Sequence, residues 1–336
     1  MIEGRSLTRT FAGRGGLVHR AGVRALRGVD FTIPDHGAVS FIGESGCGKT
    51  TLGRILCGLE TFDSGDLVID GQSMAELRPA QRQPYFRRIQ MIHQDPYSAL
   101  NPTRTIGQIL ADPLELRARQ LGRDDAWAHG RRDELLGLVG LDPGYVLPRY
   151  PHMLSGGMRQ RVVIARALTV DPEVLVADEA VSMIDVSLRL GILELLRDLR
   201  ERVGVSVLFI THDVATARYI GQDGKLYVIY RGSVIEQGAT DTVIQQPVHP
   251  YTQCLLSAIP VLRGLEEPGP DRLTPTGPLD ESVQPPGCLF EPRCPFAASD
   301  CAAAPPTLAR RGGTAQQHAC LYPEGRSVVA APVGAT

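Results

Sequence analysis

A glycine-rich loop at residues 43–51 constrains the fold of this chain more than any other feature. It reads Gly-Glu-Ser-Gly-Cys-Gly-Lys-Thr-Thr, follows an apolar run at residues 38–42 and precedes a helix-like segment at residues 52–59. Strand, glycine-rich turn and helix is the order in which the pattern G-x-x-x-x-G-K-[ST] forms a phosphate-binding loop. Its glycines let successive N–H groups point at one anion, and the helix N-terminus adds its dipole. The sequence therefore predicts an ATP site here.

Lys49 and Thr50 are the loop residues with the most specific expected roles. Lys49 would reach the β- and γ-phosphates, and the Thr50 hydroxyl would bind Mg²⁺. The chain has 35 Lys plus Arg but only two lysines, Lys49 and Lys225, so an Arg-rich sequence keeps a compact point charge at this position. The full set expected to contact ATP in the loop is Gly43, Glu44, Ser45, Gly46, Cys47, Gly48, Lys49, Thr50 and Thr51.

Strand-like and helix-like segments alternate through the middle of the chain. Apolar, β-branched runs at residues 38–42, 88–93, 174–177 and 205–210 alternate with helical patterns, the clearest at residues 187–203. This alternation predicts an α/β fold with a mainly parallel sheet, whose ligands lie at the carboxyl ends of the strands. Four polar residues follow such ends: Gln94, Asp178, Glu179 and His212.

These four side chains can divide the chemistry of ATP hydrolysis among them. Asp178 is placed to hold Mg²⁺ through its water shell, and Glu179 to act as general base for the attacking water. Gln94 can orient water or Mg²⁺ from the far side, and His212 can hydrogen-bond the γ-phosphate. An acidic pair after a strand is usually a solvated strand end, and a single His is usually structural. Their order behind a phosphate loop favours the catalytic interpretation.

Three further segments complete the outline. Short strands are expected at residues 7–11, 25–29 and 31–33, where Phe11 either stacks on adenine or is a core residue, and a Gly/Arg-rich excursion spans residues 12–23. Helical periodicity at residues 104–150 predicts a helical insertion. Ser155, Gly156 and Gly157 precede the helical run at residues 162–168 and form a second helix N-terminus suited to an anion.

Net charge and hydropathy exclude other classes of protein. The net charge of −2 gives no basic surplus for nucleic acid. No apolar window is long enough to cross a membrane, and residues 1–5 lack the apolar core of a signal peptide. We therefore expect a cytoplasmic location, with any membrane role supplied by partners.

Four of the seven cysteines lie in the last fifty residues, within a Pro-rich tail that begins near residue 246. They are spaced C-x5-C-x6-C-x18-C, at Cys288, Cys294, Cys301 and Cys320. Four thiolates can bind Zn²⁺ or a [4Fe–4S] cluster, and four free thiols are the remaining alternative. A tail with so little apolar periodicity needs a cross-link to become ordered, which favours metal. We expect Cys294→Ser to loosen the tail without affecting the phosphate loop.

With these motifs in place, the chain resembles the ABC ATPases. Leu154-Ser155-Gly156-Gly157 looks like their signature, continued by Met158, and every motif of the family occurs in order over residues 5–322. The resemblance implies an α/β fold of the P-loop NTPase type with four parts. These are a RecA-like core, an antiparallel β subdomain, a helical signature subdomain and a small Cys-rich C-terminal extension. The implied division is an ATPase domain at residues 1–245, its helical subdomain about 96–160, and an extension at residues 246–336.

The resemblance also implies a head-to-tail dimer of ATPase domains. The signature of one subunit, Ser155 to Met158, would close on ATP held by the phosphate loop of the other. Asp185 matches the loop that communicates across such dimers. The implied partners are a second ATPase subunit, two permease subunits and an extracytoplasmic substrate-binding protein, at the cytoplasmic face of the cell (inner) membrane.

Further motifs narrow the subfamily. Three stretches are similar to oligopeptide/dipeptide importer ATPases: residues 94–102 (Gln-Asp-Pro-Tyr-Ser-Ala-Leu-Asn-Pro), 249–253 and 286–296. The Gln-Asp-Pro-Tyr form and the excursion near residues 12–23 resemble the second of the two ATPases that such systems pair. The implied function is ATP hydrolysis that drives peptide import, and the implied tail cofactor is the iron–sulfur cluster. Nickel, glutathione or sugar import, a soluble ABC ATPase of DNA repair or translation, and a regulatory domain without turnover are the alternatives.

Three departures from the family pattern stand near the site. Met158 replaces the usual Gln, Ala180 replaces the Pro after the catalytic Glu, and Met183-Ile184 replaces Ala-Leu. None of them removes a phosphate, metal or water ligand, so we expect an active ATPase.

Overall fold

The computed structural model describes residues 1–12, 22–261, 266–278 and 284–332. Its centre is an eight-stranded sheet in the order β12-β13-β10-β9-β3-β8-β7-β6. Five of its strands are β3 (Ala38–Ile42), β6 (Ile89–Ile92) at one edge, β7 (Val174–Asp178), β8 (Ser206–Thr211) and β9 (Lys225–Tyr230). These five run parallel to one another, as the alternation of the sequence predicts. Their carboxyl ends therefore share one edge of the sheet.

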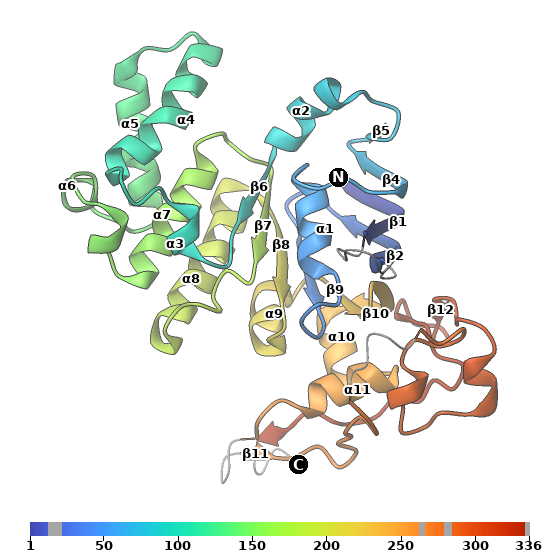
Figure 1. Cartoon of the computed structure of the whole chain (residues 1–336). Helices are drawn as coiled ribbons and strands as arrows, with labels where there is room; N and C mark the ends of the chain where they lie inside the picture. The colour runs from blue at the N-terminus through green and yellow to red at the C-terminus, as the bar shows by residue number, and fades with distance from the viewer. Residues whose placement is uncertain (13–21, 262–265, 279–283, 333–336) are drawn as a thin grey trace, which may run out of the picture.

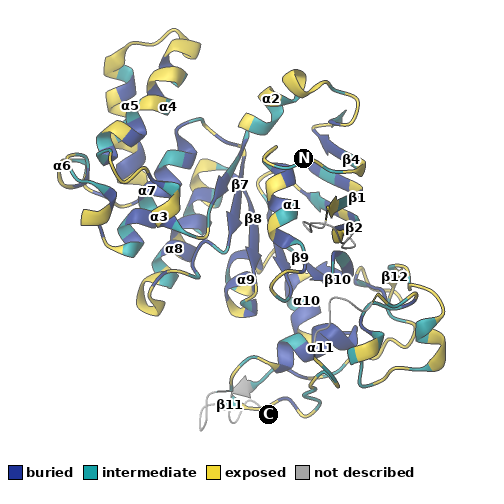
Figure 2. Cartoon of the chain, in the orientation of Figure 1, coloured by how far each residue is buried: buried dark blue, intermediate teal, exposed yellow. Residues whose placement is uncertain are grey.

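These parallel strands are mostly hydrophobic because both of their faces are covered (Figure 2). Every residue of β3, β7 and β8 is buried. Alternate residues of β7 enter different cores: Leu175 and Ala177 face the core shared with the helices of the signature side, whereas Val174 and Val176 face the core shared with the antiparallel sheet. Because successive side chains of the strand point to opposite faces, the sheet packs against one layer on each face.

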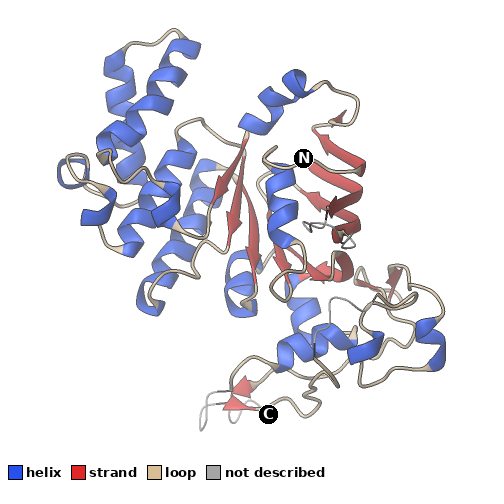
Figure 3. Ribbon diagram, in the orientation of Figure 1, coloured by secondary structure: helices blue, strands red, loops and turns tan. Residues whose placement is uncertain are grey.

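A second, antiparallel sheet covers one face of the central sheet (Figure 3). Its strands, in the order β2-β1-β4-β5, are β1 (Ile2–Phe11), β2 (Val23–Ile33), β4 (Ser64–Ile69) and β5 (Gln72–Ser73). Helix α1 (Lys49–Leu56) packs in the same core. The two short strands expected at residues 25–29 and 31–33 are one continuous strand, β2. Residues 13–21 of the expected excursion lie outside the described residues.

Helices form the lobe on the other face of the central sheet. They are α3 (Pro96–Ala99), α4 (Ile106–Leu121), α5 (Asp125–Leu138), α6 (Pro143–Val146), α7 (Gly156–Leu168) and α8 (Val186–Asp198), with a short π-helix at Leu199–Val203. Helix α4 starts at a capping box formed by Thr105 and Gln108. The helical insertion expected at residues 104–150 is confirmed, and it lies beside α7 and α8 (Figure 1).

The part of the chain after residue 240 contains two helices that the sequence pattern did not reveal, α10 (Thr240–Gln245) and α11 (Pro250–Ser257). Its strand β13 (Gln317–His318) pairs with β10 (Ser233–Ala239), and β12 (Ala309–Arg310) pairs with β13. Phe290 and Val328 are fully buried in a third core, together with Tyr230 and Tyr251. The remaining elements are α2 (Pro79–Arg87), α9 (Val214–Gly221), three 3-10 turns at Pro151–Met153, Glu291–Arg293 and Ser299–Ala302, and the pair β11 (Glu266–Glu267) with β14 (Ala331–Pro332).

Among the helices of the described residues, none has both the length and the apolar character that a membrane crossing requires.

Candidate functional site

The phosphate loop lies between β3 and α1, at the carboxyl edge of the parallel strands. Lys49 is the first residue of α1 and is only 5% exposed. Its ammonium group donates hydrogen bonds to the carbonyl oxygens of Gly43 (2.8 Å) and Glu44 (2.9 Å). The charge is therefore held over the loop, where a phosphate bound to the N-terminus of α1 would meet it.

Gly48 shows why the loop needs glycine. Its φ of 105° is in the left-handed region, and a Cβ atom at this position would lie 2.1 Å from the backbone oxygen of Ala25 in β2. Any side chain would thus collide with backbone that cannot move aside. The antiparallel sheet and the phosphate loop are packed directly against each other at this point.

Thr50 and Asp178 come together from opposite sides of the site. The Thr50 hydroxyl donates a hydrogen bond of 3.2 Å to the carboxyl group of Asp178, the last residue of β7. Burial raises the pKa of this carboxyl, and the bond from Thr50 opposes the shift. A hydroxyl and a buried carboxylate side by side are the oxygen ligands that Mg²⁺ prefers, so the residues present fit that ion.

Glu179 and His212 form the second pair of the site. Nδ1 of His212 lies 2.8 Å from Oε1 of Glu179. Glu179 has a φ of 50°, which is unusual for a residue with a side chain, and its N–H donates to the Ile210 carbonyl at 2.9 Å. Such strain is concentrated at functional sites, where it aims a side chain in a fixed direction.

Gln94 and Phe11 lie at the borders of this site. The register pairs Ile92 of β6 with Ala177 of β7, so Gln94 follows its strand at the level of Glu179, and its side chain is exposed. Phe11 ends β1 with 36% of its surface exposed, and the Arg9 guanidinium lies 5.0 Å from the centre of its ring. Phe11 belongs to none of the three hydrophobic cores among the described residues, and its contact with adenine stays a prediction.

The expected signature starts a helix, as its cap-like Ser suggested. The Ser155 hydroxyl accepts a hydrogen bond from the N–H of Met158 (3.3 Å) at the N-terminus of α7. Gly157 is buried against Leu188 of α8, and Asp185 occupies the N-cap position of α8 without a side-chain hydrogen bond to the helix. Helix α7 packs in the core of the helical lobe, whereas α1 packs in the opposite core. One chain therefore carries the signature and the phosphate loop on different sides of its sheet.

The four tail cysteines line one small cavity of about 20 Å³, together with Phe290 and Phe296. Burial raises the pKa of three of their thiols, to about 11 for Cys320, and neighbouring thiols add to the shifts of Cys294 and Cys320. Four thiols around one cavity fit a metal centre in kind. As they are arranged, however, no three His, Cys, Asp or Glu side chains in the described part of the chain are close enough together to hold a metal ion. The expected iron–sulfur cluster is thus not supported by this geometry.

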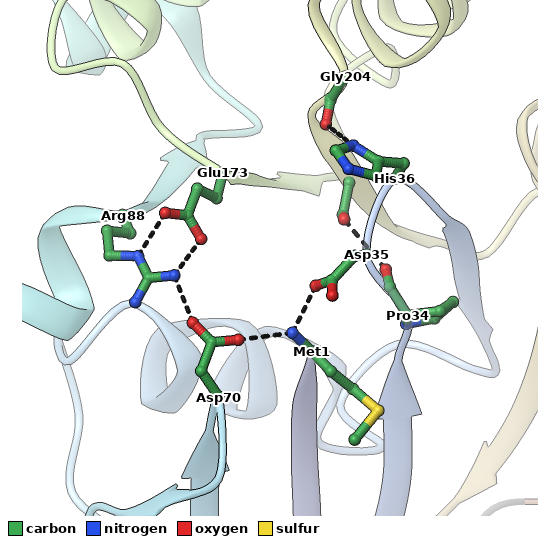
Figure 4. Close-up of polar contacts among 9 residues, drawn as sticks. Met1, Pro34, Asp35, His36, Asp70, Arg88, Glu173 and Gly204 are labelled. Carbon is green, nitrogen blue, oxygen red and sulfur yellow. Dashed lines mark hydrogen bonds and ion pairs between the residues drawn. The ribbon is translucent and has the colours of Figure 1, made fainter.

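A larger cavity of about 310 Å³ lies at the opposite, amino end of the parallel strands (Figure 4). Here Arg88 contacts both Asp70 and Glu173, and the Met1 nitrogen contacts Asp35 and Asp70. These two positive groups and three carboxylates form a chain of ion pairs that connects the antiparallel sheet to the start of β7. The cavity is therefore a junction between layers rather than a second nucleotide site.

Comparison with known proteins agrees with this geometry. The family model described as "ABC transporter" matches residues 26–182, and that of the "Oligopeptide/dipeptide transporter, C-terminal region" matches residues 235–301. The chain is 39% identical to the di/tripeptide transport ATP-binding protein DppF of Pseudomonas aeruginosa, over 92% of this chain and 94% of that protein. It is 41% identical to a probable peptide ABC transporter ATP-binding protein, y4tS, of Sinorhizobium fredii, over 85% of this chain and 79% of that protein.

Solved structures give the same result for the fold. A dimeric structure of the ATP-binding cassette MJ0796, in a post-hydrolysis state bound to ADP and Pi, superposes with a TM-score of 0.62. The two chains are 27% identical in sequence, and the match covers 71% of this chain and 99% of the MJ0796 chain.

Proposed function

Because this chain belongs to the ABC transporter ATPases that carry the oligopeptide/dipeptide C-terminal region, we propose that it is the subunit that hydrolyses ATP to drive import of di- or oligopeptides. The observation that carries the proposal is the match along nearly the whole chain to a di/tripeptide transport ATP-binding protein. Both regions that define such proteins are present, and the ATPase residues meet at one edge of the sheet.

In the proposed mechanism the phosphate loop binds the triphosphate of ATP. The N–H groups of residues 43–51 and the Lys49 ammonium neutralise the β- and γ-phosphates. Thr50, Asp178 and Gln94 would hold Mg²⁺, which supplies positive charge to the phosphate oxygens. Phe11 would stack on adenine from the end of β1.

Glu179 then accepts a proton from the water that attacks the γ-phosphorus, and ADP leaves. The bond from Nδ1 of His212 fixes the direction of the Glu179 carboxylate and leaves Nε2 facing the phosphate. His212 would in this way report the γ-phosphate to the base.

The complete ATP site is proposed to form between two subunits. The signature residues Ser155, Gly156, Gly157 and Met158 lie on the side of the sheet away from the chain's own phosphate loop, so they would act on ATP held by a partner. The surface beside them is suited to an interface, since Met183 and Val186, on either side of Asp185, are 61% and 77% exposed. The partner is proposed to be a second ATPase subunit of the same transporter.

The remaining partners follow from the importer function. We propose two permease subunits, through which the chain attaches to the cytoplasmic face of the membrane, and a substrate-binding protein on the other side. The division into residues 1–245 and 246–336 stays a prediction. The match to the C-terminal region begins at residue 235, ahead of the proposed boundary, and the match to the ATPase family ends at residue 182.

The test is ATP hydrolysis by the chain reconstituted with its permease, paired ATPase and binding protein. Adding di-, tri- and longer peptides should stimulate hydrolysis and grade the preferred length. If Ni²⁺, glutathione or a sugar stimulated hydrolysis and no peptide did, the proposed ATPase activity would stand and the proposed substrate would be wrong. Turnover without any dependence on the permease would favour a soluble ABC ATPase.

We further propose that the four tail thiols bind a [4Fe–4S] cluster, with Zn²⁺ as the alternative. The proposal is supported by the spacing of the cysteines and by the family resemblance, which favours iron; the thiols would have to move closer together to hold the cluster. Protein purified without oxygen should absorb near 400 nm and contain iron and sulfide. Zinc in the metal analysis would select the alternative, and no metal with four titratable thiols would remove the proposal.

A further inference from the structure

We propose that Arg293, in the C-terminal extension, is a positioning residue for the phosphate loop, so that the cysteine-lined segment which carries it regulates ATP affinity. The inference deepens the proposed function and rests on it. It starts from an ion pair between two residues 249 positions apart, Arg293 and Glu44. Glu44 is the second residue of the phosphate loop.

The ion pair has the geometry of a specific contact. Nη1 of Arg293 lies 2.9 Å from Oε2 of Glu44, and Nη2 lies 3.1 Å from Oε1. The Arg293 side chain is 11% exposed and that of Glu44 is 32% exposed. Arg293 also donates to the Tyr230 hydroxyl at 3.3 Å and to the Gly277 carbonyl at 3.2 Å. A two-point pair of this kind fixes both direction and distance, unlike a typical surface ion pair.

Glu44 is held at its backbone as well. Its N–H donates to the hydroxyl of Tyr251 in α11 at 2.8 Å, and its carbonyl accepts the bond from Lys49. Tyr251 is buried and packs against Tyr230 and Phe290, with ring centres 4.5 Å and 5.5 Å away. Two residues from beyond the ATPase motifs, Arg293 and Tyr251, therefore set the position of a loop residue that contacts the essential lysine.

The ion pair between Arg293 and Glu44 also changes the charge of the phosphate loop. An unpaired Glu44 carboxylate would stand in the loop that receives the triphosphate and would repel it. Arg293 neutralises this carboxylate without filling the site, because it approaches from the side of Tyr230. Loss of Arg293 should thus weaken ATP binding both by freeing the loop and by exposing a like charge.

The segment that carries Arg293 is the one that carries two of the tail thiols. Residues 288–294 form tight turns, in which the N–H of Glu291 donates to the Cys288 carbonyl (3.0 Å) and the N–H of Cys294 to the Glu291 carbonyl (3.1 Å). Cys294 directly follows Arg293. Any group that links Cys288 to Cys294 would therefore fix the backbone segment to which the Arg293 side chain is attached. The expectation that Cys294→Ser leaves the phosphate loop unaffected does not fit this arrangement.

The experiment titrates the full-length protein with a fluorescent trinitrophenyl-ATP and follows hydrolysis in the reconstituted transporter. Arg293→Gln should raise the Kd about fivefold and raise KM for ATP by a similar factor, with kcat within about twofold of the wild type. In a Glu44→Gln background the same change should have little effect, because the carboxylate it neutralises is gone. The matched control is Arg326→Gln, also in the extension, where Arg326 pairs with Glu324 and lies over Phe296.

The outcomes separate this inference from the function on which it rests. Equal Kd values for folded Arg293→Gln and wild type overturn it, as does an effect of the same size in the Glu44→Gln background. Lys49→Ala must abolish probe binding; if it does not, the proposed ATP site itself fails. Should Arg293→Gln not fold, Arg293→Lys keeps the charge, and amide hydrogen exchange of residues 43–50 should be faster than in Arg326→Lys. Equal exchange in these two variants overturns the inference.

Discussion

Glu179 carries the clearest prediction at the scale of single residues. Glu179→Gln keeps the shape of the side chain and its bond to His212 but removes the proton acceptor. Hydrolysis should fall about 10²- to 10⁴-fold while ATP binding is retained. The ATP-bound dimer should then accumulate, which size-exclusion chromatography with ATP and Mg²⁺ would show. Turnover that stays near the wild-type rate would mean that another residue is the base, and that the domain does not use Glu179 as proposed.

A buried carboxyl and a buried imidazole predict how stability depends on pH. Burial raises the pKa of Glu236 to about 7, from 4.5, although the N–H groups of Val248 and His249 and the Gln316 side chain donate to it. Burial lowers the pKa of His249 to about 3, from 6.5, and also lowers that of His318. As pH falls from 7 to 4.5 the folded state gains stability from Glu236, because it takes up a proton that the unfolded chain still lacks. As pH falls below 6.5 it loses stability at the histidines, because only the unfolded chain takes up their protons.

The two effects oppose each other between pH 4.5 and 6.5, and Glu236→Gln should separate them. Between pH 7 and pH 5 this variant should lose about 2 kcal/mol more unfolding free energy than the wild type. Urea unfolding at both pH values measures the difference, with Glu115→Gln, on the exposed face of α4, as the control. A parallel response of wild type and Glu236→Gln would show that Glu236 is already ionised at pH 5 in the folded protein.

The side chains proposed for the ATP site could be selected from the sequence because each stands next to a strand or helix end with a clear pattern. Arg293 and Tyr251 could not be predicted as neighbours of Glu44. Both lie more than 200 positions away, and no local periodicity brings distant chain segments together. The Gly48 contact with Ala25 was hidden for the same reason.

At the scale of elements, two helix caps test whether Ser155 does more than start a helix. Ser155 caps α7 and Thr105 caps α4, each through a 3.3 Å bond to a backbone N–H. Either Ser155→Ala or Thr105→Ala should cost about 1 kcal/mol of unfolding free energy. Only Ser155→Ala should also reduce ATP hydrolysis in the assembled transporter, because Ser155 is proposed to face the partner's ATP. Equal ATPase rates in the two variants would mean that Ser155 only caps the helix and does not act on the partner's ATP.

The elements that sequence patterns missed share a physical cause. Helices α9, α10 and α11 have six to eight residues, too few to show an amphipathic period, and they are stabilised by packing against β3, β9 and β10. Strands β12 and β13 have two residues each and exist only through pairing with β10. The long helices α4 and α5 and the buried inner strands were predictable, since their periods extend over several turns or alternations.

At the scale of the whole molecule, the extension is built into the ATPase rather than attached to it. Tyr230 and Ile235 from the ATPase part share a core with Phe290 and Val328, and Glu236 accepts hydrogen bonds from residues after 245. A chain that ends at Gln245 should therefore expose this core and the edge of β10. We expect it to aggregate, or to unfold at least 10 °C below the full chain. A monomeric truncated protein with full-length thermal stability and ATP affinity would show that the extension is an independent unit.

The pairing of β10 with β13 also bears on how the protein is made. On the ribosome, residues 233–239 emerge some eighty residues before their partner at residues 317–318. During that interval the sheet ends in an open edge, which is the kind of surface that recruits other chains. The nucleotide-binding sheet is therefore completed late in translation. A nascent chain stalled before residue 317 would expose the open edge of β10, to which a chaperone would bind.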